Sequence, residues 1–446
     1  LHRSIRGITK TDKAALHNKL HASLAYNYKL QLTPQSKSSE LEMSLVKYGI
    51  LLATLTLALA EAQNGCIIPI ASKRHLYIQW PLIYKSNGEL YPAQLDAEQQ
   101  TASIHLPVGE EVLLSCGPNY LKNFHRAETL SVKCESDGKL ISLSGDADIE
   151  NNAKAVSYFA CDLRVVDEVL SRVNDCNTQA WTPVAYGYVN PFDHLTHIIG
   201  EACYDENEGR TIFAHIKLSD NPYLQRLPKD FLTKFHHPDG RYKTQLFRGL
   251  YFDEIYERIR QTLHTKSAPF LHKANFVDDF FISNAQFQAV KKLSWNYFVA
   301  HDDLDAWTEL KRNILAHRNN SKADLDIYVG SHGTQVLNGP NGEQMKLYLH
   351  PESGEYGKFP VPELLWIVVK EEDKSTAFGV YNDANPKSLQ GVVSATSHAP
   401  ICKSKCGEIT WLSDALKNGG LICCSVPEFR KVVTEVPAIT ENDSPF

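Results

Sequence analysis

The sequence predicts an α+β fold, in which a mixed domain of strands and helices follows a small β-rich module that contains cysteines. Short apolar runs broken by turn residues fill the stretch from Cys66 to about Thr196, and helical and strand patterns mix from about His197 onward. All ten cysteines lie after residue 62. The 446 residues, 43% of them hydrophobic and 22% charged, suffice for two or three domains with sizeable cores.

Residues 43–62 have the pattern of a secretory signal peptide. Met43–Lys47 is a short basic start, Tyr48–Ala60 is an apolar run, and small residues at Ala58, Ala60 and Ala62 offer a cleavage site. The run is too short for a good membrane span, and the alternative is a buried core helix. We therefore expect a secreted, extracellular protein that is not inserted in a membrane. Residues 1–42 are interpreted as translated upstream sequence.

The part of the chain that follows the predicted signal peptide has a net negative charge. Residues 63–446 contain 38 Lys and Arg residues against 48 Asp and Glu, a formal net charge of −10. A positive field over the whole molecule is therefore excluded. A nucleic acid would have to be bound through a local basic patch or a metal.

The even number of cysteines predicts disulfide bonds, because export places them in an oxidising compartment. Zinc ligation by Cys402, Cys406, Cys423 and Cys424 is the alternative for the last four. The sequon at Asn319 and a second one at Asn442, which Pro445 weakens, predict a glycoprotein.

The β-rich module is expected over residues 63–196 and contains five of the cysteines. Its short apolar runs predict strands. These runs are Ser103–Pro107, Glu111–Cys116, Lys139–Leu143 and Tyr158–Cys161.

The mixed domain is expected over residues 197–446. Tyr251–Leu263 has helical spacing, and Asp303 can cap a second helix whose Leu304, Trp307, Leu310 and Ile314 share one face. Alternating or continuous apolar runs predict the strands. These are Thr211–Ile216, Leu325–Val329, Met345–Leu349, Leu364–Val369 and Ala377–Tyr381.

Four short segments of this domain carry a family resemblance in order along the chain. They are Glu201-Ala-Cys-Tyr-Asp205 with Gly209-Arg-Thr-Ile-Phe213, Phe280-Phe-Ile-Ser-Asn284, Ala323-Asp-Leu-Asp-Ile-Tyr-Val-Gly330, and Val361-Pro-Glu-Leu-Leu-Trp366. Together they resemble the DNA/RNA non-specific endonucleases, the ββα-metal nucleases, in their secreted insect form. The resemblance implies a ββα-metal nuclease-like domain in which Phe280–Asn284 is a strand end that bears the metal ligand.

The resemblance also implies the chemistry. In this family a histidine of an Asp-Arg-Gly-His-like motif acts as general base on a water that attacks phosphorus. The matching stretch has Ala268, Pro269 and Phe270 in place of Arg, Gly and His. Phenylalanine has no lone pair that takes a proton, so the ordinary mechanism cannot run. His272 is a possible substitute base, but two residues along a strand span roughly 6.6 Å.

The metal ligand implied by the resemblance is Asn284, with Mg²⁺ or Mn²⁺ as the cofactor. Of the nearby Pro-Gln that the family often has, Gln286 and Gln288 remain. A lone amide is a poor ligand for a hard dication, which prefers several oxygens. Asp278 and Asp279 could add ligands, although solvated turn positions are the simpler interpretation. The sequence thus predicts a decayed metal site.

A basic stretch from Leu224 to Arg248 predicts nucleic-acid contacts, because cations interleaved with aromatic rings suit phosphates and stacked bases. The alternative is an exposed loop whose aromatic residues belong to the core. Lys291 and Lys292 could extend the binding surface. The candidate residues of the stretch are Arg226, Lys229, Lys234, Arg241, Tyr242, Lys243 and Arg248.

Within the family, the chain resembles the salivary nucleic-acid-binding proteins of tsetse flies. This implies a secreted pseudoenzyme that binds DNA and RNA without sequence preference and has lost cleavage or retains only residual activity. Two alternatives stay open. One is a low-activity metal-dependent endonuclease that uses His272 and Asn284, and the other is a non-catalytic extracellular protein that binds a partner.

Overall fold

The computed structural model describes most of the chain after residue 64. The segments expected as upstream sequence and signal peptide, and the second sequon at Asn442, lie outside the described residues. The described residues are 65–71, 79–96, 101–117, 119–124, 126–143, 154–162, 167–170, 176, 181–205, 207–220, 223–228, 249–264, 266, 268, 270–282, 284–301, 304–339, 341–349, 359–383 and 400–439.

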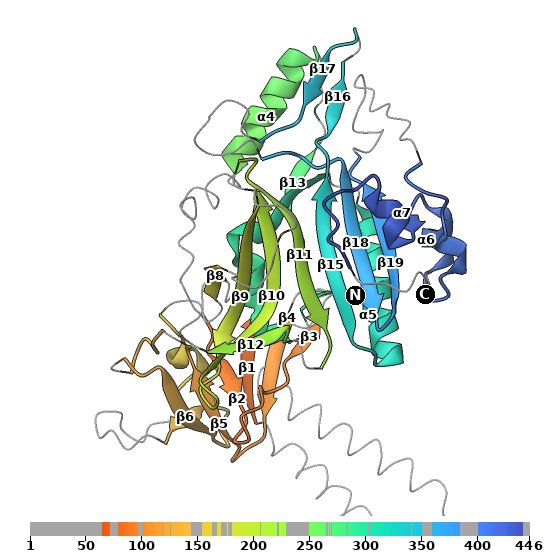
Figure 1. Cartoon of the computed structure of the whole chain (residues 1–446). Coiled ribbons are helices and arrows are strands. Elements are labelled where there is room, and N and C mark those ends of the chain that lie inside the picture. The colour runs from red at the N-terminus through yellow and green to blue at the C-terminus, as the bar shows by residue number, and fades with distance from the viewer. Residues whose placement is uncertain are drawn as a thin grey trace, which may run out of the picture. The chain divides into compact units, whose positions relative to one another are not determined.

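Two small antiparallel sheets form the cysteine-containing module (Figure 1). The first has the order β1-β4-β3, with β1 (Cys66–Ala71), β3 (Gln94–Asp96) and β4 (Thr101–Leu106). The second has the order β2-β5-β6-β7, with β2 (Leu82–Tyr84), β5 (Glu111–Ser115), β6 (Thr129–Cys134) and β7 (Leu140–Ser142). The strands expected near residues 103, 111 and 139 are therefore confirmed. Tyr158–Cys161 is not a strand, because Tyr158 and Phe159 lie in the 3-10 helix η1 (Val156–Phe159) and Cys161 forms isolated bridges.

A nine-stranded antiparallel sheet forms the centre of the rest of the chain. Its order is β20-β19-β18-β15-β11-β10-β9-β8, and β12 pairs with β10. The boundary expected near residue 196 falls within β10, and β8 and β9, which precede it, belong to the same sheet. The strands are β8 (Asp167–Leu170), β9 (Thr182–Val189), β10 (Leu195–Asp205), β11 (Arg210–Leu218), β12 (Gln225–Pro228), β15 (Leu325–His332), β18 (Leu364–Glu371), β19 (Lys374–Tyr381) and β20 (Ile422–Cys424).

Both faces of this sheet are covered, as its sequence pattern requires. Leu325, Ile327 and Val329 of β15 pack in one core with residues of helix α5 (Asp305–Ser321). Trp366 and Val368 of β18 pack in another core with C-terminal residues, including those of α7 (Val426–Arg430). A strand buried on both faces reads as a continuous apolar run, and β18 has this pattern.

The remaining elements are short apart from one helix. They make the domain a mixed α and β structure that is mostly sheet, as the α+β prediction states. They are α4 (Gly249–Thr262), β13 (Leu271–Asn275), η3 (Ala285–Lys292), η4 (Ser294–Asn296), β14 (Tyr297–His301), β16 (Val336–Asn338), β17 (Gln344–Lys346), η5 (Cys406–Glu408) and α6 (Asp414–Asn418).

All ten cysteines form disulfides, which confirms that prediction and removes the zinc alternative. The pairs are Cys66–Cys134, Cys116–Cys161, Cys176–Cys203, Cys402–Cys424 and Cys406–Cys423. The last two attach the segment before α6 to β20, an edge strand of the large sheet. Within the described ranges, none of the helices has the length and apolar character needed to cross a bilayer.

Candidate functional site

A β-β-α unit carries the first candidate site. Strands β13 and β14 pair antiparallel, with Leu271 opposite His301 and Asn275 opposite Tyr297, and α5 follows β14 in sequence. Helix α5 forms because Trp307, Leu310 and Ile314 recur on one face and are buried. This is the helix that the spacing predicted.

A cavity of about 380 Å³ lies between β13, the segment after it and the start of α5; we call it the lysine groove. Two ion pairs lie along it. Lys291 Nζ is 2.7 Å from Asp279 Oδ1, and Lys311 Nζ contacts Asp278 Oδ2. The aspartates are therefore not the solvated turn residues that the sequence suggested. The groove is lined by His272, Lys273, Ala274, Asn275, Asp278, Asp279, Phe280, Lys291, Leu304, Trp307, Thr308 and Lys311.

Cations lie over aromatic rings along the groove. Lys273 Nζ is 3.9 Å from the ring centre of Tyr297, and Lys311 Nζ is 5.4 Å from that of Phe280. Lys273 is exposed, whereas Lys311 is buried. Three lysines against two aspartates give the lining a small positive charge, in a chain whose formal net charge is −6.

Phe270 directly precedes β13, and its ring is 56% exposed and stacked near Tyr256. His272, two residues further along and within β13, lines the lysine groove, whereas Phe270 is not one of its lining residues. Ala268 packs against a small core that includes residues of α4, and Pro269 lies outside the described residues.

Asn284 does not end a strand, so the expected placement of Phe280–Asn284 is wrong. Phe280 and Phe281 lie in a turn, and Asn284 is the N-cap of η3, where its side-chain oxygen accepts a 3.0 Å hydrogen bond from Gln286 N–H. A cap needs an extended residue with a side-chain acceptor, which asparagine supplies. Asn284 lines a different cavity from His272, so the structure does not bring the two into one cavity.

The side chains present do not fit a divalent metal at either residue. In the part of the chain that the structure describes, no group of three His, Cys, Asp or Glu side chains could hold a metal ion. The carboxylates of Asp278 and Asp279, which line the groove beside His272, are held by lysines. A hard dication prefers several oxygen ligands, and here the nearest carboxylates are already neutralised.

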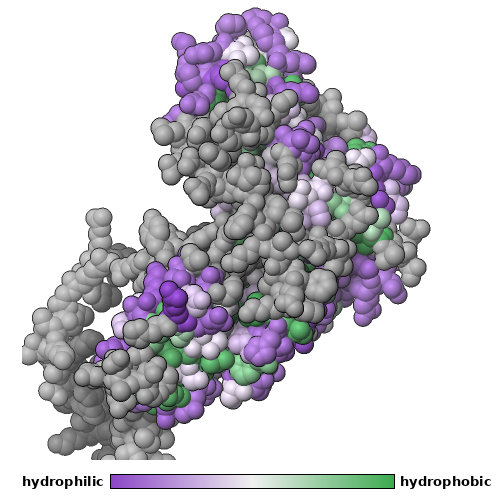
Figure 2. Space-filling model, turned by 60° about the vertical axis from the view of Figure 1, so that its left-hand side comes forward, coloured by the Kyte–Doolittle hydropathy of each residue, from purple (hydrophilic) through white to green (hydrophobic). Residues whose placement is uncertain are grey.

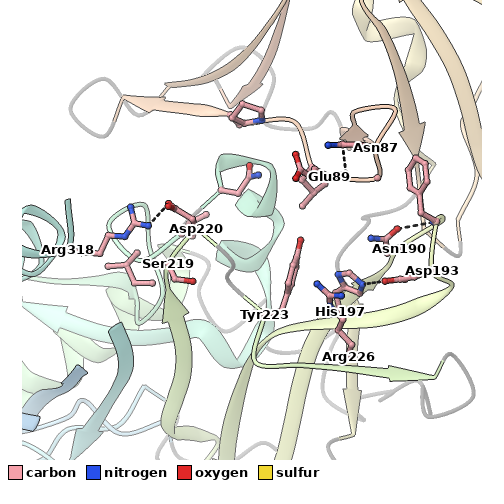
Figure 3. Close-up of a pocket in the computed structure, with 18 of the residues that line it drawn as sticks. Asn87, Glu89, Asn190, Asp193, His197, Ser219, Asp220, Tyr223, Arg226 and Arg318 are labelled. Atoms are coloured by element: carbon pink, nitrogen blue, oxygen red, sulfur yellow. Dashed lines mark hydrogen bonds and ion pairs between the residues drawn. The ribbon is translucent and has the colours of Figure 1, made fainter. Parts of the chain in front are cut away.

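A second cavity, of about 880 Å³, lies where the turn after β2, the turn between β9 and β10, β12 and the end of α5 meet; we call it the asparagine cavity. Figure 3 shows Asn87 and Glu89 on one side and Tyr223 and His197 on the other. The lining is Asn87, Gly88, Glu89, Leu90, Pro92, Ala93, Asn190, Phe192, Asp193, His197, Leu218, Ser219, Asp220, Tyr223, Arg226, Ile282, Asn284, Leu315, Arg318 and Asn319.

A buried histidine and an aspartate form a pair in this cavity. His197 is 2% exposed, and its Nε2 lies 2.8 Å from Asp193 Oδ2. Burial lowers the pKa of His197 and outweighs the opposite effect of Asp193. Burial alone would raise the pKa of Asp193, but hydrogen bonds from Leu195 N–H and His197 together lower it. The ring is therefore neutral, Nε2–H donates to the carboxylate, and Nδ1 is left as an acceptor.

Tyrosine hydroxyls and one arginine complete this side of the cavity. Tyr188 Oη–H donates to Tyr223 Oη over 2.8 Å, which leaves the Tyr223 proton for another acceptor. Arg226 is exposed and lies 5.4 Å from the Tyr223 ring centre. Within the predicted basic stretch Leu224–Arg248, Arg226 is the candidate that the structure describes; Lys229, Lys234, Arg241, Tyr242, Lys243 and Arg248 lie outside the described residues. Lys292 belongs to η3, but its side chain is not described.

Exposed hydrophobic residues give no single docking surface among the described residues. Figure 2 shows hydrophobic residues in small areas among hydrophilic ones on the face that it presents. Isolated apolar side chains of this kind are normal on soluble proteins. The large exposed ones are Ile67, Val108, Tyr120, Leu143, Phe192, Phe270 and Val432.

No sequence pattern singles out His197, Asp193, Asn190 and Tyr223. Asn190, Asp193 and His197 lie around one turn between two strands, and a cluster of polar residues there reads as an ordinary loop. A comparison of the chain with models of protein families found no match, and a search of the curated proteins found none either.

Proposed function

We propose that this is a secreted, salivary-type protein that binds DNA and RNA through the lysine groove, descends from a non-specific endonuclease and has lost cleavage. The observation that carries the proposal is the β-β-α unit with cations over aromatic rings in its groove. A ββα-metal nuclease ancestry accounts for the order of β13, β14 and α5. The five disulfides favour an oxidising, extracellular compartment.

The side chains at and near the groove support the proposed loss of cleavage. Phe270 offers no general base, and the residues around His272 and Asn284 do not form a metal site among the described residues. General-base catalysis typically contributes about 10²–10⁴-fold. Hydrolysis slower by at least this factor is expected relative to a family member with an intact Arg-Gly-His.

Binding remains physically possible without catalysis. Lys273 is exposed in the groove and can neutralise a phosphate. Lys291 can donate to an oxygen of a second phosphate while it stays paired with Asp279. Contacts of this kind do not read sequence. The predicted basic stretch around Arg241 would add further cations to the same nucleic acid.

Gel-shift titrations at several salt concentrations, with single- and double-stranded DNA and RNA, test the proposal. The variant is Lys273→Gln combined with Lys291→Gln, which keeps both side-chain stems. The matched control is Lys374→Gln, an exposed lysine at the start of β19. We expect salt-dependent binding that the groove variant weakens and the control does not. No shift at low salt for any nucleic acid would favour the partner-binding alternative.

A low-activity nuclease is the second candidate, because His272 lines the groove two residues from the expected base position. Plasmid nicking with Mg²⁺ or Mn²⁺, with and without a chelator, separates it from a binder. Chelator-sensitive nicking that disappears in His272→Ala would establish cleavage and reject the loss of activity.

A further inference from the structure

The lysine groove and the asparagine cavity are lined by the same two segments of chain. Residues 278–280 line the groove, and Ile282 and Asn284 line the cavity. On α5, Lys311 lines the groove and Arg318 the cavity. Two residues seven apart lie on one face of a helix, about 10 Å apart along its axis. A single flexible ligand lying along α5 can therefore contact both.

Each carboxylate of the cavity has a polar partner. Asp193 accepts a hydrogen bond from the neutral His197, Asp220 pairs with Arg318, and Glu89 pairs with Lys85. Arg226 lies over the ring of Tyr223. Among the described residues that line the cavity, it is the cation that forms no ion pair with a carboxylate. Three carboxylates in the lining disfavour a bare phosphate inside, whereas Arg226 suits one negative charge at the exposed edge.

The uncharged groups supply both donors and acceptors. The side-chain oxygens of Asn87 and Asn190 accept hydrogen bonds from Glu89 N–H and Phe192 N–H, at 3.1 and 2.9 Å. Their amide nitrogens remain as donors, and Figure 3 shows that of Asn190 directed into the cavity. Asn284 also lines the cavity, and because its oxygen caps η3, its amide nitrogen remains as a donor.

A buried acceptor belongs to His197, one of the residues that line this cavity. His197 Nδ1 has no hydrogen-bond partner within the described protein, although the side chain is 98% buried. A buried polar atom without a partner costs free energy, which a ligand donor would recover. Phosphate oxygens at neutral pH are mainly acceptors and cannot fill this role, whereas the edge of a nucleobase carries both donors and acceptors. The rings of Tyr223 and Phe192 offer apolar surface for a base.

We propose that the asparagine cavity binds one nucleoside of a single-stranded nucleic acid, with the base inside and its phosphate at Arg226, while the adjoining strand lies in the lysine groove. The part that concerns the strand rests on the proposed function. A base can enter such a cavity only when it is unpaired, so the site favours single strands.

Isothermal titration calorimetry of the full chain tests this with four nucleosides, their 5′-monophosphates, inorganic phosphate and maltose. We expect nucleosides to bind and monophosphates to bind more tightly. Tyr223→Phe removes one hydroxyl, and nucleoside affinity should fall roughly tenfold. Arg226→Gln should abolish the advantage of the monophosphates over the nucleosides, and Lys374→Gln should alter neither affinity. Because Arg226 is exposed, its variant keeps the test valid if Tyr223→Phe does not fold.

The outcomes separate this inference from the proposed function. Salt-dependent gel shifts without nucleoside binding would overturn the cavity site and leave the groove standing. Nucleoside binding without any gel shift would support the cavity and reject nucleic-acid binding. Binding of maltose or inorganic phosphate in place of nucleosides would show that the cavity takes another ligand, and it would overturn the inference.

Discussion

The lysine groove holds its charges in ion pairs, whereas the asparagine cavity holds uncharged donors and a buried acceptor next to them. In the groove, Lys291 and Lys311 attract phosphate and are weakened as ligands by Asp279 and Asp278. In the cavity, the asparagine amides and His197 Nδ1 offer directional hydrogen bonds to a ligand and carry no charge. Ionic contacts weaken with salt, and hydrogen bonds and stacking depend on it little. The salt dependence of binding can therefore separate the two regions by experiment, although both are lined by residues of α5.

The largest expected effect comes from Gln286, which holds the segment common to both regions. Its side chain accepts from Ile83 N–H at 2.7 Å and donates to Ile83 O and Tyr91 O, at 3.2 and 2.7 Å. It thereby ties η3 to β2 of the cysteine-containing module. Gln286→Ala removes the partner of Ile83 N–H and of Tyr91 O, whereas Ile83 O still accepts from Tyr91 N–H at 2.7 Å. Each group left unpaired costs about 1–3 kcal/mol.

We expect Gln286→Ala to lower the free energy of unfolding by about 2 kcal/mol or more in denaturant titrations. Both nucleoside affinity and gel-shift affinity should fall with it, because the shared segment loses its anchor. The control is Gln344→Ala, an exposed glutamine that donates only to Asn338. Loss of one kind of binding with the other intact would show that the two regions are not joined through this segment.

The second prediction concerns the salt dependence of binding, which should differ between variants of the lysine groove and variants of the asparagine cavity. Each phosphate contact contributes a slope of about −0.7 on a log–log salt plot for single strands. Lys273→Gln with Lys291→Gln should flatten the slope by about 1.4. Tyr223→Phe should lower affinity and leave the slope unchanged. If Tyr223→Phe flattens the slope, or if the lysine variant keeps the slope of the parent, the groove and the cavity do not differ in salt dependence as proposed.

The large elements could be predicted because their signals are local. The spacing of Trp307, Leu310 and Ile314 predicted α5, and the alternation of Leu325, Ile327 and Val329 predicted β15, and both are confirmed. Burial of one face is a property of a short stretch of sequence, so it can be read without knowing the partners. The disulfides were equally predictable from the export signal and the even count, although their pairing was not.

The cavity could not be predicted because its residues come from distant positions. Asn87, His197 and Arg318 meet only after the module, the sheet and α5 have packed together. The error at Asn284 has a related cause. A Ser-Asn pair after an apolar run fits both a strand end and a helix cap, and the hydrogen bond to Gln286 N–H decides for the cap. The charge pairing of Asp278 with Lys311 is likewise a tertiary contact.

A smaller effect is expected with pH, because histidines in the core are held neutral. Burial lowers the pKa of His197 and of His301, which is hydrogen-bonded to Gln335. The folded protein binds these protons less tightly than the unfolded chain, so stability is lost as the pH falls below the ordinary histidine value of 6.5. The free energy of unfolding should be lower at pH 5 than at pH 7.5. Nucleoside affinity should fall in the same window, since a protonated Nδ1 no longer accepts. An unchanged or higher stability at pH 5 would contradict the assignment.

The smallest expected effect concerns a glycan at Asn319, the sequon residue that lines the asparagine cavity. Asn319 is exposed near the end of α5, one residue after Arg318. A glycan there would stand at the mouth of the cavity and hinder access without removing any contact, so nucleoside affinity should fall only a few-fold, about 1 kcal/mol or less. The groove lies about two helical turns away, and its salt slope should not change. The measurement compares protein from a glycosylating host, before and after enzymatic removal of the glycan, with Asn319→Gln as the control that carries none. If removal of the glycan changes the salt slope and leaves nucleoside affinity the same, the cavity does not open where Asn319 lies, and the division of roles between the two regions is wrong.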